Sequence, residues 1–468
     1  MASNDSLFKE IIIHLKEKGF IFQGSEIYSG LANTWDYGPL GVKLKNNIKQ
    51  QWWNFFVEKN QYNVGLDSSI LMNSKVWTAS GHLSNFSDPL IDCKSCKARF
   101  RADNLINVKR PDIIFDGWSS EKLEKFIVDN HIKCLKCNQE DWTSIRQFQL
   151  MFETHQGVIK DEHNKIYLRP ETAQGIFINF NNVRKSVNQK IPFGIGQIGK
   201  SFRNEITPSN FIFRTREFEQ MELEFFFIPQ NQNDNTWFDY WVNQCKIFLA
   251  SVGLSNSKNL SFKQHEPNQL AHYALATTDI EYNFPFGMSE LCGICNRGNY
   301  DLTKHSESSG VKMEVQDPNV ATKKMVIPSV IEPSMGVERL LLALICEAYT
   351  KEVLTDGRQR IVLKLDKNIV PFQVAIMPSN KNKFGALATK IFDDLKYTQL
   401  KVIYETAANV GKSYRYQDGI GTMYCVTVDY ATEEQGTVTV RDRNTTQQEI
   451  VPLSSLKKYL YNKLDIIC

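Results

Sequence analysis

Phe218-Glu-Gln-Met-Glu-Leu-Glu-Phe-Phe-Phe227 alternates between apolar and polar residues, and this period of two predicts a β-strand. One face of the strand carries only apolar side chains: Met221, Leu223, Phe225 and Phe227. The other face carries Gln220, Glu222 and Glu224. An acidic face opposite an apolar face is unusual in a protein core and is typical of the floor of a binding site. We therefore expect this strand to line a functional site.

Further elements are predicted on both sides of this strand. Residues 165–168 have strand character and lead into Arg169-Pro-Glu-Thr172, where a helix can begin. Apolar residues at helical spacing follow the Tyr37-Gly-Pro39 turn, and an apolar helix is expected from Arg339 to about Tyr349. This mixture of strands and helices is typical of an α+β protein.

Length and composition limit the possible classes of protein. A chain of 468 residues should form roughly three domains of about 150 residues each. Its 42% hydrophobic and 23% charged residues exclude a disordered or collagen-like chain. The 55 basic and 52 acidic residues give a net charge of +3, so any nucleic acid must bind to a local patch. The longest apolar run, Leu340–Cys346, is too short to cross a bilayer, and no secretory signal precedes it, so we expect a cytoplasmic protein without membrane contact.

Three Cys-x-x-Cys pairs suggest reduced thiols that can bind metal. The first two pairs, Cys93/Cys96 and Cys134/Cys137, are separated by 37 residues and can supply four thiolates to a tetrahedral zinc ion. We therefore predict a zinc-binding insertion at residues 92–142. The third pair, Cys292/Cys295, lies beside Glu290, and we interpret these two cysteines as small buried residues.

The last hundred residues alternate strand and helix patterns, which predicts a separate small α/β domain at 370–468 after a charged linker at 356–369. This domain contains twelve Lys/Arg and ten Asp/Glu residues, so we expect RNA to bind only at local clusters. Two clusters are candidates. Lys412 and Arg415 lie beside Tyr414 and Tyr416, whose rings suit unstacked bases, and Arg441 and Arg443 form a second basic pair.

Residues 194–201, Gly-Ile-Gly-Gln-Ile-Gly-Lys-Ser, match two phosphate-binding patterns, G-x-G-x-x-G and G-x-x-x-x-G-K-[ST]. A phosphate-binding loop of the second kind requires a helix that begins at its Gly-Lys-Ser segment. Pro208 prevents a long helix there, and the next apolar strand ends without an aspartate for magnesium. The context therefore argues against an ATPase of this class.

Three short motifs resemble class II aminoacyl-tRNA synthetases. Phe202-Arg-Asn-Glu205 resembles motif 2, Gly336-Val-Glu-Arg339 resembles motif 3, and Tyr37-Gly-Pro-Leu-Gly41 with its helix resembles motif 1, the dimer element. Longer strings resemble the dimeric glycyl-tRNA synthetases of class IIa: Leu168-Arg-Pro-Glu-Thr-Ala-Gln-Gly175, Phe218-Glu-Gln-Met-Glu222, Ser289-Glu-Leu291 and Glu332-Pro-Ser-Met-Gly336. The resemblance covers essentially the whole chain, although the Cys292/Cys295 pair departs from the family pattern.

The resemblance implies a class II antiparallel-sheet catalytic domain at 1–355, with a helical insertion at 229–283, and a C-terminal anticodon-binding domain. It further implies an enzyme that activates glycine with ATP and Mg²⁺ and transfers it to tRNA(Gly). Arg203 and Arg339 would bind phosphates and Glu290 would hold magnesium, and the resemblance implies these three as the catalytic residues. The residues implied in ATP binding are Arg203, Asn204, Glu205, Phe213, Arg214, Thr215, Arg216, Glu217, Phe218, Glu290, Leu291, Gly336, Val337, Glu338 and Arg339.

Glycine offers no side chain to grip, so its ammonium is the only positive group that a pocket can hold, and paired acids suit it. The resemblance implies Glu171, Glu222 and Glu332 for this role, with Ser334 as a neutral partner and Arg101 closing over the site. The full implied glycine set is Arg101, Glu171, Phe218, Glu219, Gln220, Met221, Glu222, Glu332, Pro333, Ser334, Met335 and Gly336. Glu222 lies on the acidic strand face that alternation alone predicts.

The helix after Pro39 is rich in aromatic residues. Trp52, Trp53, Phe55 and Phe56 exceed what one buried stripe needs, so we predict a two-fold homodimer through the helix after Pro39. A non-catalytic, synthetase-like accessory subunit that binds nucleic acid should lack the arginines that grip phosphate. A class II synthetase for another amino acid would differ in which amino acid it activates.

Overall fold

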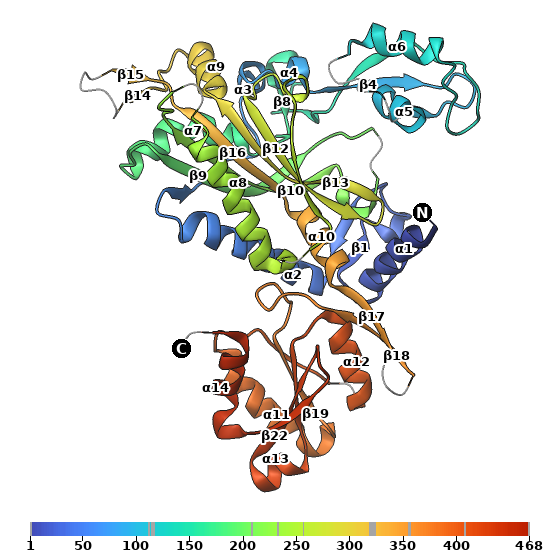
Figure 1. The fold of residues 1–468 in the computed structure, drawn as a ribbon, viewed down its shortest axis with the longest axis vertical. Coiled ribbons are helices and arrows are strands. Elements are labelled where there is room, and N and C mark those ends of the chain that lie inside the picture. The colour runs from blue at the N-terminus through green and yellow to red at the C-terminus, as the bar shows by residue number, and fades with distance from the viewer. Residues whose placement is uncertain are drawn as a thin grey trace.

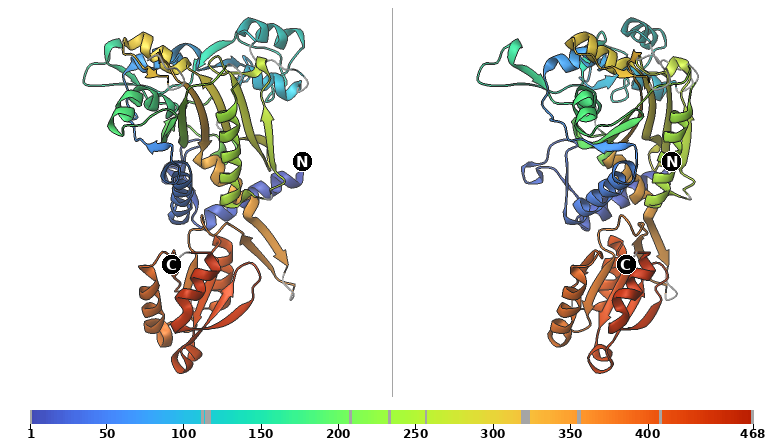
Figure 2. Two further views of the ribbon diagram at one scale, coloured as in Figure 1. Left: turned by 60° about the vertical axis from the view of Figure 1, so that its left-hand side comes forward. Right: turned by 90° about the vertical axis from the view of Figure 1, so that its left-hand side faces the viewer.

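The computed structural model describes residues 2–110, 113, 118–206, 209–231, 234–255, 257–317, 324–353, 357–406 and 409–466. Figure 1 shows a large part that contains the first three quarters of the chain and a smaller C-terminal part joined to it. The views of Figure 2 show the same two parts joined at a narrow waist. The predicted α+β class, with a cysteine cluster and a C-terminal α/β unit, is confirmed.

A seven-stranded sheet forms the centre of the large part, in the order β11-β12-β13-β16-β10-β9-β3. All neighbours pair antiparallel except β3 and β9, which are parallel. The strand bounds are β3 Asn63–Gly65, β9 Phe193–Phe202, β10 Glu217–Phe227, β11 Leu260–Gln264, β12 Ala276–Phe284, β13 Gly287–Gly298 and β16 Ser329–Gly336. Residues 194–201 therefore form a strand within β9, which excludes a phosphate-binding loop at this position.

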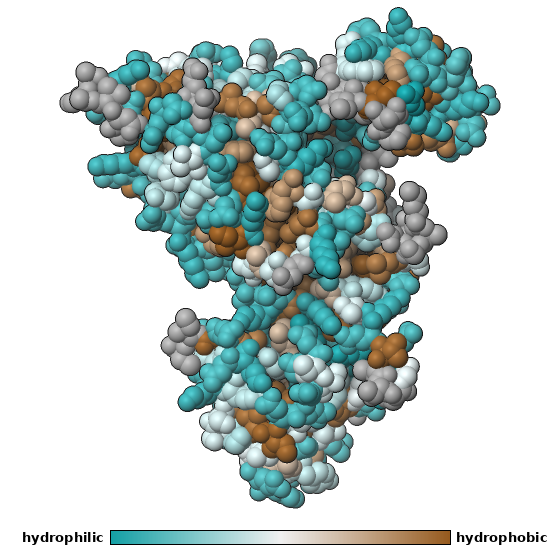
Figure 3. All heavy atoms as spheres, in the orientation of Figure 1, coloured by the Kyte–Doolittle hydropathy of each residue, from teal (hydrophilic) through white to brown (hydrophobic). Residues whose placement is uncertain are grey.

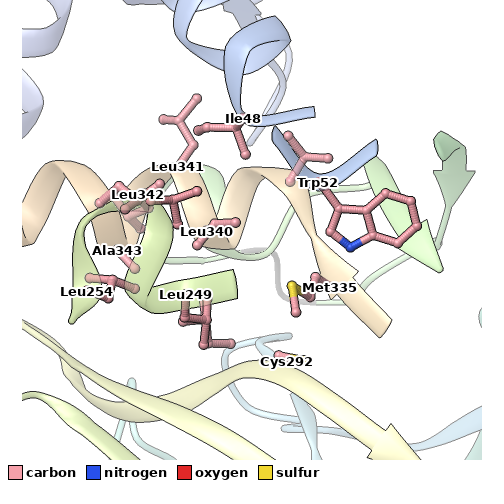
Figure 4. Close-up of a cluster of buried hydrophobic side chains, with 14 of the residues drawn as sticks. Ile48, Trp52, Leu249, Leu254, Cys292, Met335, Leu340, Leu341, Leu342 and Ala343 are labelled. Carbon is pink, nitrogen blue, oxygen red and sulfur yellow. The ribbon is translucent and has the colours of Figure 1, made fainter. Parts of the chain in front are cut away.

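The strand predicted from alternation is β10, and its two faces pack differently. Met221, Leu223 and Phe225 lie in a large core with helices α2 (Pro39–Trp53), α8 (Thr236–Leu249) and α10 (Val337–Ala348). Figure 4 shows Leu340–Ala343 of α10 between Ile48 and Trp52 of α2 and Met335 of β16. On the other face, Phe226 packs beneath α7 (Ala173–Ser186) and α9 (Tyr300–Ser309). The helices leave Gln220 and Glu222 of this face to the candidate site.

The start of α2 packs closely against the preceding hairpin, β1 (Ile21–Gln23) with β2 (Trp35–Tyr37). A Cβ atom added to Gly41 would lie 1.9 Å from the carbonyl oxygen of Phe20, so only glycine allows this approach. The aromatic residues at the end of α2 serve the protomer's own core, because Trp52 and Phe56 are fully buried and Trp53 and Phe55 pack against them. These four aromatic side chains therefore belong to the core of the chain itself, and the predicted homodimer stays a prediction.

The cysteine-rich segment forms a small unit at one edge of the large part (Figure 1). Its sheet has the order β5-β4-β6, with β4 Ser87–Asp92, β5 Arg99–Arg101 and β6 Arg146–Gln149. Helices α5 (Ala102–Lys109) and α6 (Ser120–Asp129) complete a separate apolar cluster that includes Cys93 and Cys134. Residues 111, 112 and 114–117 of the predicted insertion lie outside the described residues.

The predicted helical insertion at 229–283 is only partly helical. Helix α8 and the one-turn element η5 (Ala250–Leu254) occupy its first half, but β11 and β12 follow and extend the central sheet. The helical stretch ends at Leu254, so the insertion that the resemblance implies is helical only in its first half.

The C-terminal part is built on a five-stranded sheet in the order β20-β19-β21-β22-β23. Its elements are β19 Val374–Pro378, α11 Lys381–Lys396, β20 Val402–Tyr404, α12 Val410–Ile420, β21 Tyr424–Val428, α13 Tyr430–Gln435, β22 Thr437–Asp442, β23 Gln448–Pro452 and α14 Leu453–Leu464. The linker predicted at 356–369 is not irregular, because β18 (Gln359–Leu363) pairs with β17 (Tyr349–Val353) in a hairpin. The boundary predicted between 355 and 356 lies outside the described residues.

The remaining elements are short, apart from the N-terminal helix. They are α1 Ala2–Glu17, η1 Glu26–Tyr28, η2 Asn54–Glu58, α3 Ser74–Ala79, α4 His82–Asn85, β7 Glu153–His155, η3 Glu162–Asn164, β8 Lys165–Tyr167, η4 Phe211–Phe213, η6 Pro267–Gln269, β14 Val315–Gln316 and β15 Met325–Val326. The face visible in Figure 3 is mostly hydrophilic, with apolar residues in separate small groups. Within the described ranges, no helix has the length and apolar character needed to cross a membrane.

Candidate active site

Two adjoining clefts open on the acidic face of the sheet. The first is lined by Arg203, Glu205, Ile212, Phe213, Arg214, Thr215, Phe218, Gln220, Glu290, Leu291, Ser334, Gly336, Glu338 and Arg339. The second shares Arg203, Gln220, Glu290 and Ser334 with the first and adds Glu171, Glu222, Glu332 and Arg297. The two clefts therefore combine an arginine-rich cavity with an acidic one.

Arg203 lines both clefts, and contacts on two sides hold its guanidinium. Its Nε donates to the carbonyl oxygen of Pro170 at 3.1 Å. The guanidinium carbon lies 5.3 Å from the ring centroid of Phe218 and 5.4 Å from that of Phe86. Guanidinium groups bind phosphates and carboxylates through paired N–H donors, so Arg203 can hold either anion at the junction.

Arg339 and Glu290 face each other across the first cleft. Arg339 Nη1 donates to Glu290 Oε2 at 3.1 Å and to the Glu290 carbonyl oxygen at 3.2 Å. The guanidinium also lies 4.5 Å from the ring centroid of Phe213. The Glu290 side chain is 51% exposed, so its carboxylate can reach a cation at the cleft edge, and magnesium prefers such oxygen ligands.

Glu222 stands at the centre of the acidic cleft. One oxygen accepts from the Thr172 backbone N–H at 2.9 Å and from the Thr172 hydroxyl. The other accepts from the Ser334 hydroxyl at 2.8 Å. In register, Ser334 of β16 lies directly opposite Glu222, so the sheet itself sets this pair. The carboxylate is therefore held in one orientation before any ligand binds.

In the acidic cleft Glu222 and Glu332 are buried and Glu171 is 14% exposed, and the three carboxyl groups differ in their pKa. Burial alone would raise the pKa of Glu171, but His82, at 3.4 Å, Arg297 and Gln174 hold the pKa of its carboxyl below the usual value. Burial and the nearby Glu171 raise the pKa of Glu222. Burial raises the pKa of Glu332 to about 8, although Arg297 opposes this shift. A cationic ligand would favour the ionised form of each group.

Arg297 of β13 is a buried residue of this cleft that the sequence did not reveal. Its Nη1 donates to both oxygens of Glu332 at 3.0 Å. Its Nε and Nη2 donate to Asp301 at 2.7 and 2.9 Å. The only local signal is the four-residue spacing from Arg297 to Asp301, which is common on protein surfaces, whereas Glu332 comes from a separate strand.

Several predicted ligand residues direct their side chains away from the clefts or bind other residues of the protein: Glu217, Glu219, Met221, Pro333, Met335, Val337 and Glu338. Glu219 lies on the opposite face of β10 from Glu222 and binds Lys45 at 2.7 Å. Met221, Met335 and Val337 are in the apolar core. These predictions followed contiguous motif strings, whereas alternate residues of a strand point to opposite faces.

Glu338 and Glu217 are paired with lysines. Glu338 is one lining residue of the first cleft, but its carboxylate binds Lys45 Nζ at 2.5 Å and accepts from the Glu219 backbone N–H at 2.9 Å. Glu217 binds Lys200 at 2.5 Å. The buried Glu338–Lys45 pair joins α10 to α2, whereas the exposed Glu217–Lys200 pair joins β10 to β9.

The connection between β9 and β10 divides its predicted residues between two cavities. Glu205, Phe213, Arg214 and Thr215 line the first cleft. Asn204 and Arg216 line a different cavity with Glu217, Trp35 and Tyr37. Arg216 Nη2 donates to the Glu205 carbonyl oxygen at 3.1 Å. Pro208, which the sequence argument used, lies outside the described residues.

Arg101 does not close over either cleft. Its side chain binds Asp88 at 3.2 Å, and its Nε donates to Asp103 at 3.1 Å. Neither cleft includes it among its described lining residues. The two aspartates hold Arg101 within the cysteine-rich unit, so its predicted place in the glycine site is wrong for this conformation.

Cys93, Cys96, Cys134 and Cys137 place their sulfur atoms within 4.8 Å of one another. The Cys93–Cys137 and Cys96–Cys134 Sγ distances are both 3.6 Å. Tetrahedral zinc with Zn–S bonds of about 2.3 Å requires sulfur atoms roughly 3.8 Å apart. Both pairs sit on the same kind of turn, in which Lys97 and Asn138 adopt positive φ. The four thiols therefore fit a structural zinc ion.

Cys292 and Cys295 cannot share a metal ion. Cys292 pairs in register with Met335 and is buried in the apolar core. Cys295 pairs with Glu332 and lines the acidic cleft. The strand thus directs the two side chains to opposite faces, in agreement with their interpretation as small buried residues.

The two candidate RNA clusters of the C-terminal part differ in exposure. Arg441 donates to Asp418 at 2.8 and 3.0 Å, and Arg443 donates to the Gly421 and Leu365 carbonyl oxygens. Both arginines are buried, so this cluster is structural and its prediction is wrong. Lys412 and Arg415 of α12 are exposed.

Comparisons with known proteins cover both parts of the chain. The model of the tRNA synthetase class II core domain (G, H, P, S and T) matches residues 152–349, and the anticodon binding domain matches residues 373–463. The glycine–tRNA ligase of Mesoplasma florum is 54% identical over 455 residues, which cover 97% of this chain and all of that protein. This chain belongs to the glycine–tRNA ligase family.

Two further members of the family are almost as similar. The glycine–tRNA ligase of Clostridium acetobutylicum is 52% identical, with 98% of this chain and 99% of that protein covered. That of Geobacillus thermodenitrificans is 51% identical, with 97% of each chain covered. The class II core match includes the β10, β16 and α10 segments that build both clefts. The resemblance predicted from the motifs is thus confirmed for the family.

Proposed function

We propose that this protein is a glycine–tRNA ligase, which activates glycine with ATP and transfers it to the 3′ end of tRNA(Gly). The observation that carries this proposal is the joining of an arginine-rich cleft to an acidic cleft through Arg203. Relatives of the same name at 51–54% identity over nearly the full length support it.

In the first step, the glycine carboxylate attacks the α-phosphorus of ATP and pyrophosphate leaves. Positioning and charge stabilisation can supply most of the catalysis, because no covalent nucleophile of the protein is needed. We assign Arg203 to the α-phosphate and the glycine carboxylate, and Arg339 to the γ-phosphate. Phe218 would stack on adenine. Arg214 can reach phosphate or the acceptor stem of tRNA.

Magnesium would be held by Glu290, with Glu205 as a second oxygen ligand in the same cleft. Bound there, the ion would neutralise charge on the phosphates during transfer. Glu290 also pairs with Arg339, which places the proposed magnesium ligand beside the arginine assigned to the γ-phosphate.

The glycine ammonium would bind among Glu171, Glu222 and Glu332, next to Ser334. The held orientation of Glu222 supports this role, since a rigid acidic pocket can exclude any substrate with a side chain. One methylene group in an apolar pocket is worth only about 1–3 kcal/mol, so steric exclusion must add to the discrimination against alanine.

We further infer a structural zinc ion on Cys93, Cys96, Cys134 and Cys137, because their geometry fits it.

We propose a division into a catalytic unit at 1–355, a connecting segment at 356–369 and an anticodon-binding unit at 370–468. The family also suggests a cytoplasmic homodimer. Exposed apolar residues Ile27, Tyr28 and Leu31 beside the β1–β2 hairpin offer a surface for it.

Charging of tRNA tests the proposed function directly. Labelled glycine should become attached to tRNA(Gly) in the presence of ATP and magnesium, and labelled alanine or serine should not. A protein that binds tRNA(Gly) but attaches nothing would instead be the accessory subunit considered above. Attachment of a different amino acid would identify a synthetase of another specificity.

A further inference from the structure

Glu224 is a fully buried acid with no hydrogen-bond partner for either carboxylate oxygen among the described residues. It lies on the same face of β10 as Glu222, two residues further along the strand. The register of β10 with β16 places it opposite Glu332, and that with β9 places it opposite Ile195. It lines neither cleft, so it stands directly behind the acidic pocket.

Among the described residues, no cation near Glu224 donates a hydrogen bond to it. Its neighbours are Glu332 on β16, Glu222 on its own strand, Asp301 on α9 and Arg297 on β13. Helix α7, which covers this face, carries charges only in its last turn, at Arg184 and Lys185. Arg297 already donates four hydrogen bonds to Asp301 and Glu332. A buried carboxylate without a counter-ion is strongly disfavoured and takes up a proton instead.

We propose that Glu224 is a neutral carboxylic acid whose proton leaves Arg297 free to hold Glu332 in place for the ammonium of glycine. The proposal rests on the proposed function of the acidic pocket. If Glu224 were ionised, it would compete with Glu332 for the only buried arginine of this cluster. Burial next to Glu332 also raises the pKa of Glu224 well above its usual value, in agreement with this state. Glu224 is thus a positioning residue that touches no substrate.

Substitutions that keep or remove the neutral group distinguish a neutral Glu224 from an ionised one. Glu224→Gln keeps a neutral polar group of the same size, whereas Glu224→Ala leaves a cavity beside Glu332. In glycine-dependent pyrophosphate exchange, we expect Glu224→Ala to raise the glycine KM by roughly tenfold more than Glu224→Gln, with the ATP KM unchanged. Equal increases in glycine KM for both variants would show that an ionised Glu224 is required and would overturn the proposal.

The pH dependence gives a second kinetic test. The neutral form is present below the raised pKa and is lost as the pH rises. In the unmodified protein, the glycine KM should therefore increase towards alkaline pH, and Glu224→Gln should flatten this increase. Glu347→Gln is the matched control, because Glu347 is a hydrogen-bonded acid that lines neither of the two clefts. An unchanged slope in Glu224→Gln would contradict the proposal.

Infrared spectroscopy tests the protonation state without relying on any activity. At neutral pH, the unmodified protein should show a protonated-carboxyl C=O band that Glu224→Gln loses and Glu347→Gln keeps. Absence of such a difference would show that Glu224 is ionised and would overturn the proposal. A band present in a protein that never activates glycine would reject the proposed function and leave the neutral state of Glu224 standing.

Discussion

Arginines at the junction and at the end of the first cleft carry most of the proposed chemistry. Arg203 directly follows β9 and Arg339 lies in α10, so the sheet and a helix position them independently. Charge that develops on the phosphates in the transition state is stabilised by such preorganised donors. Their lysine neighbour Lys200 instead binds Glu217 outside both clefts.

Replacing Arg339 therefore provides the first prediction. Arg339→Ala should lower the rate of glycine-dependent pyrophosphate exchange by about 100-fold or more, because a donor to the moving charge is lost. Lys200→Ala should change the rate less than about threefold, since its removal costs only an exposed ion pair. Rates measured side by side check this, and equal losses in the two variants would refute the assignment.

At the scale of single residues, the sequence revealed some of the site and not the rest. Alternation in β10 correctly separated Glu222 from Met221 and Leu223, because a strand has only two faces. Reading motifs as continuous strings added Glu219 and Met335, whose side chains the same alternation directs away. The place of Arg297 in the site could not be predicted, because it depends on an ion pair with Glu332 of β16. That strand is distant in the sequence and lies beside β13 only in the folded sheet.

Two elements depend on long-range partners that hold them together. The first is the cysteine-rich unit, whose apolar cluster is small and whose two cysteine turns come from opposite ends of the segment. The second is the β17–β18 hairpin, where Arg360 donates to Asp418 of α12 at 2.9 Å. Only one of these two elements could be predicted from the sequence. The cysteine spacing predicted the first, but Arg360 sits in a charged run that resembles a linker.

Zinc content is the prediction for the cysteine-rich unit. The protein should bind about one zinc per chain, and Cys134→Ser should lose it, because one of four thiolates is removed from a closed tetrahedral site. Cys292→Ala should retain the metal, as Cys292 lies in the apolar core of the central sheet. Elemental analysis of the purified proteins measures this. Zinc retained in full by Cys134→Ser would contradict the proposed ligand set.

Asp418 joins the β17–β18 hairpin to the C-terminal sheet through two arginines, and its replacement gives a prediction for stability. It binds Arg360 and Arg441, and all three side chains are buried. Asp418→Asn should lower the free energy of unfolding of the C-terminal part by about 3–5 kcal/mol, because two buried arginines lose their shared counter-charge. Thermal unfolding followed by circular dichroism checks this against Asp393→Asn, which affects an exposed acid. Equal melting temperatures for the two variants would contradict the stabilising role of Asp418.

Over the whole molecule, we propose that the two parts divide the reaction between them. Both clefts lie in the large part, and the C-terminal part contributes no lining residue to either. The exposed residues Lys412 and Arg415 lie on α12 of the C-terminal part, which packs against the β17–β18 hairpin. We therefore expect tRNA recognition to be separable from glycine activation.

Removal of the α12 charges tests this separation. The double variant Lys412→Ala/Arg415→Ala should lower kcat/KM for tRNA(Gly) by roughly tenfold, because two phosphate or base contacts are lost, and should leave pyrophosphate exchange unchanged. Lys457→Ala/Lys458→Ala on α14 is the matched control for net charge. If charging of tRNA falls equally in both, the loss reflects charge alone and α12 has no special role.

The central claim is that the two clefts together activate glycine, and one measurement tests it most directly. Exchange of labelled pyrophosphate into ATP requires only the amino acid, ATP and magnesium, so it reports the first step without tRNA. With purified protein, exchange should depend on glycine and should be at least about 100-fold slower with alanine or serine at equal concentration. Exchange that proceeds without glycine, or equally well with alanine, would contradict the account.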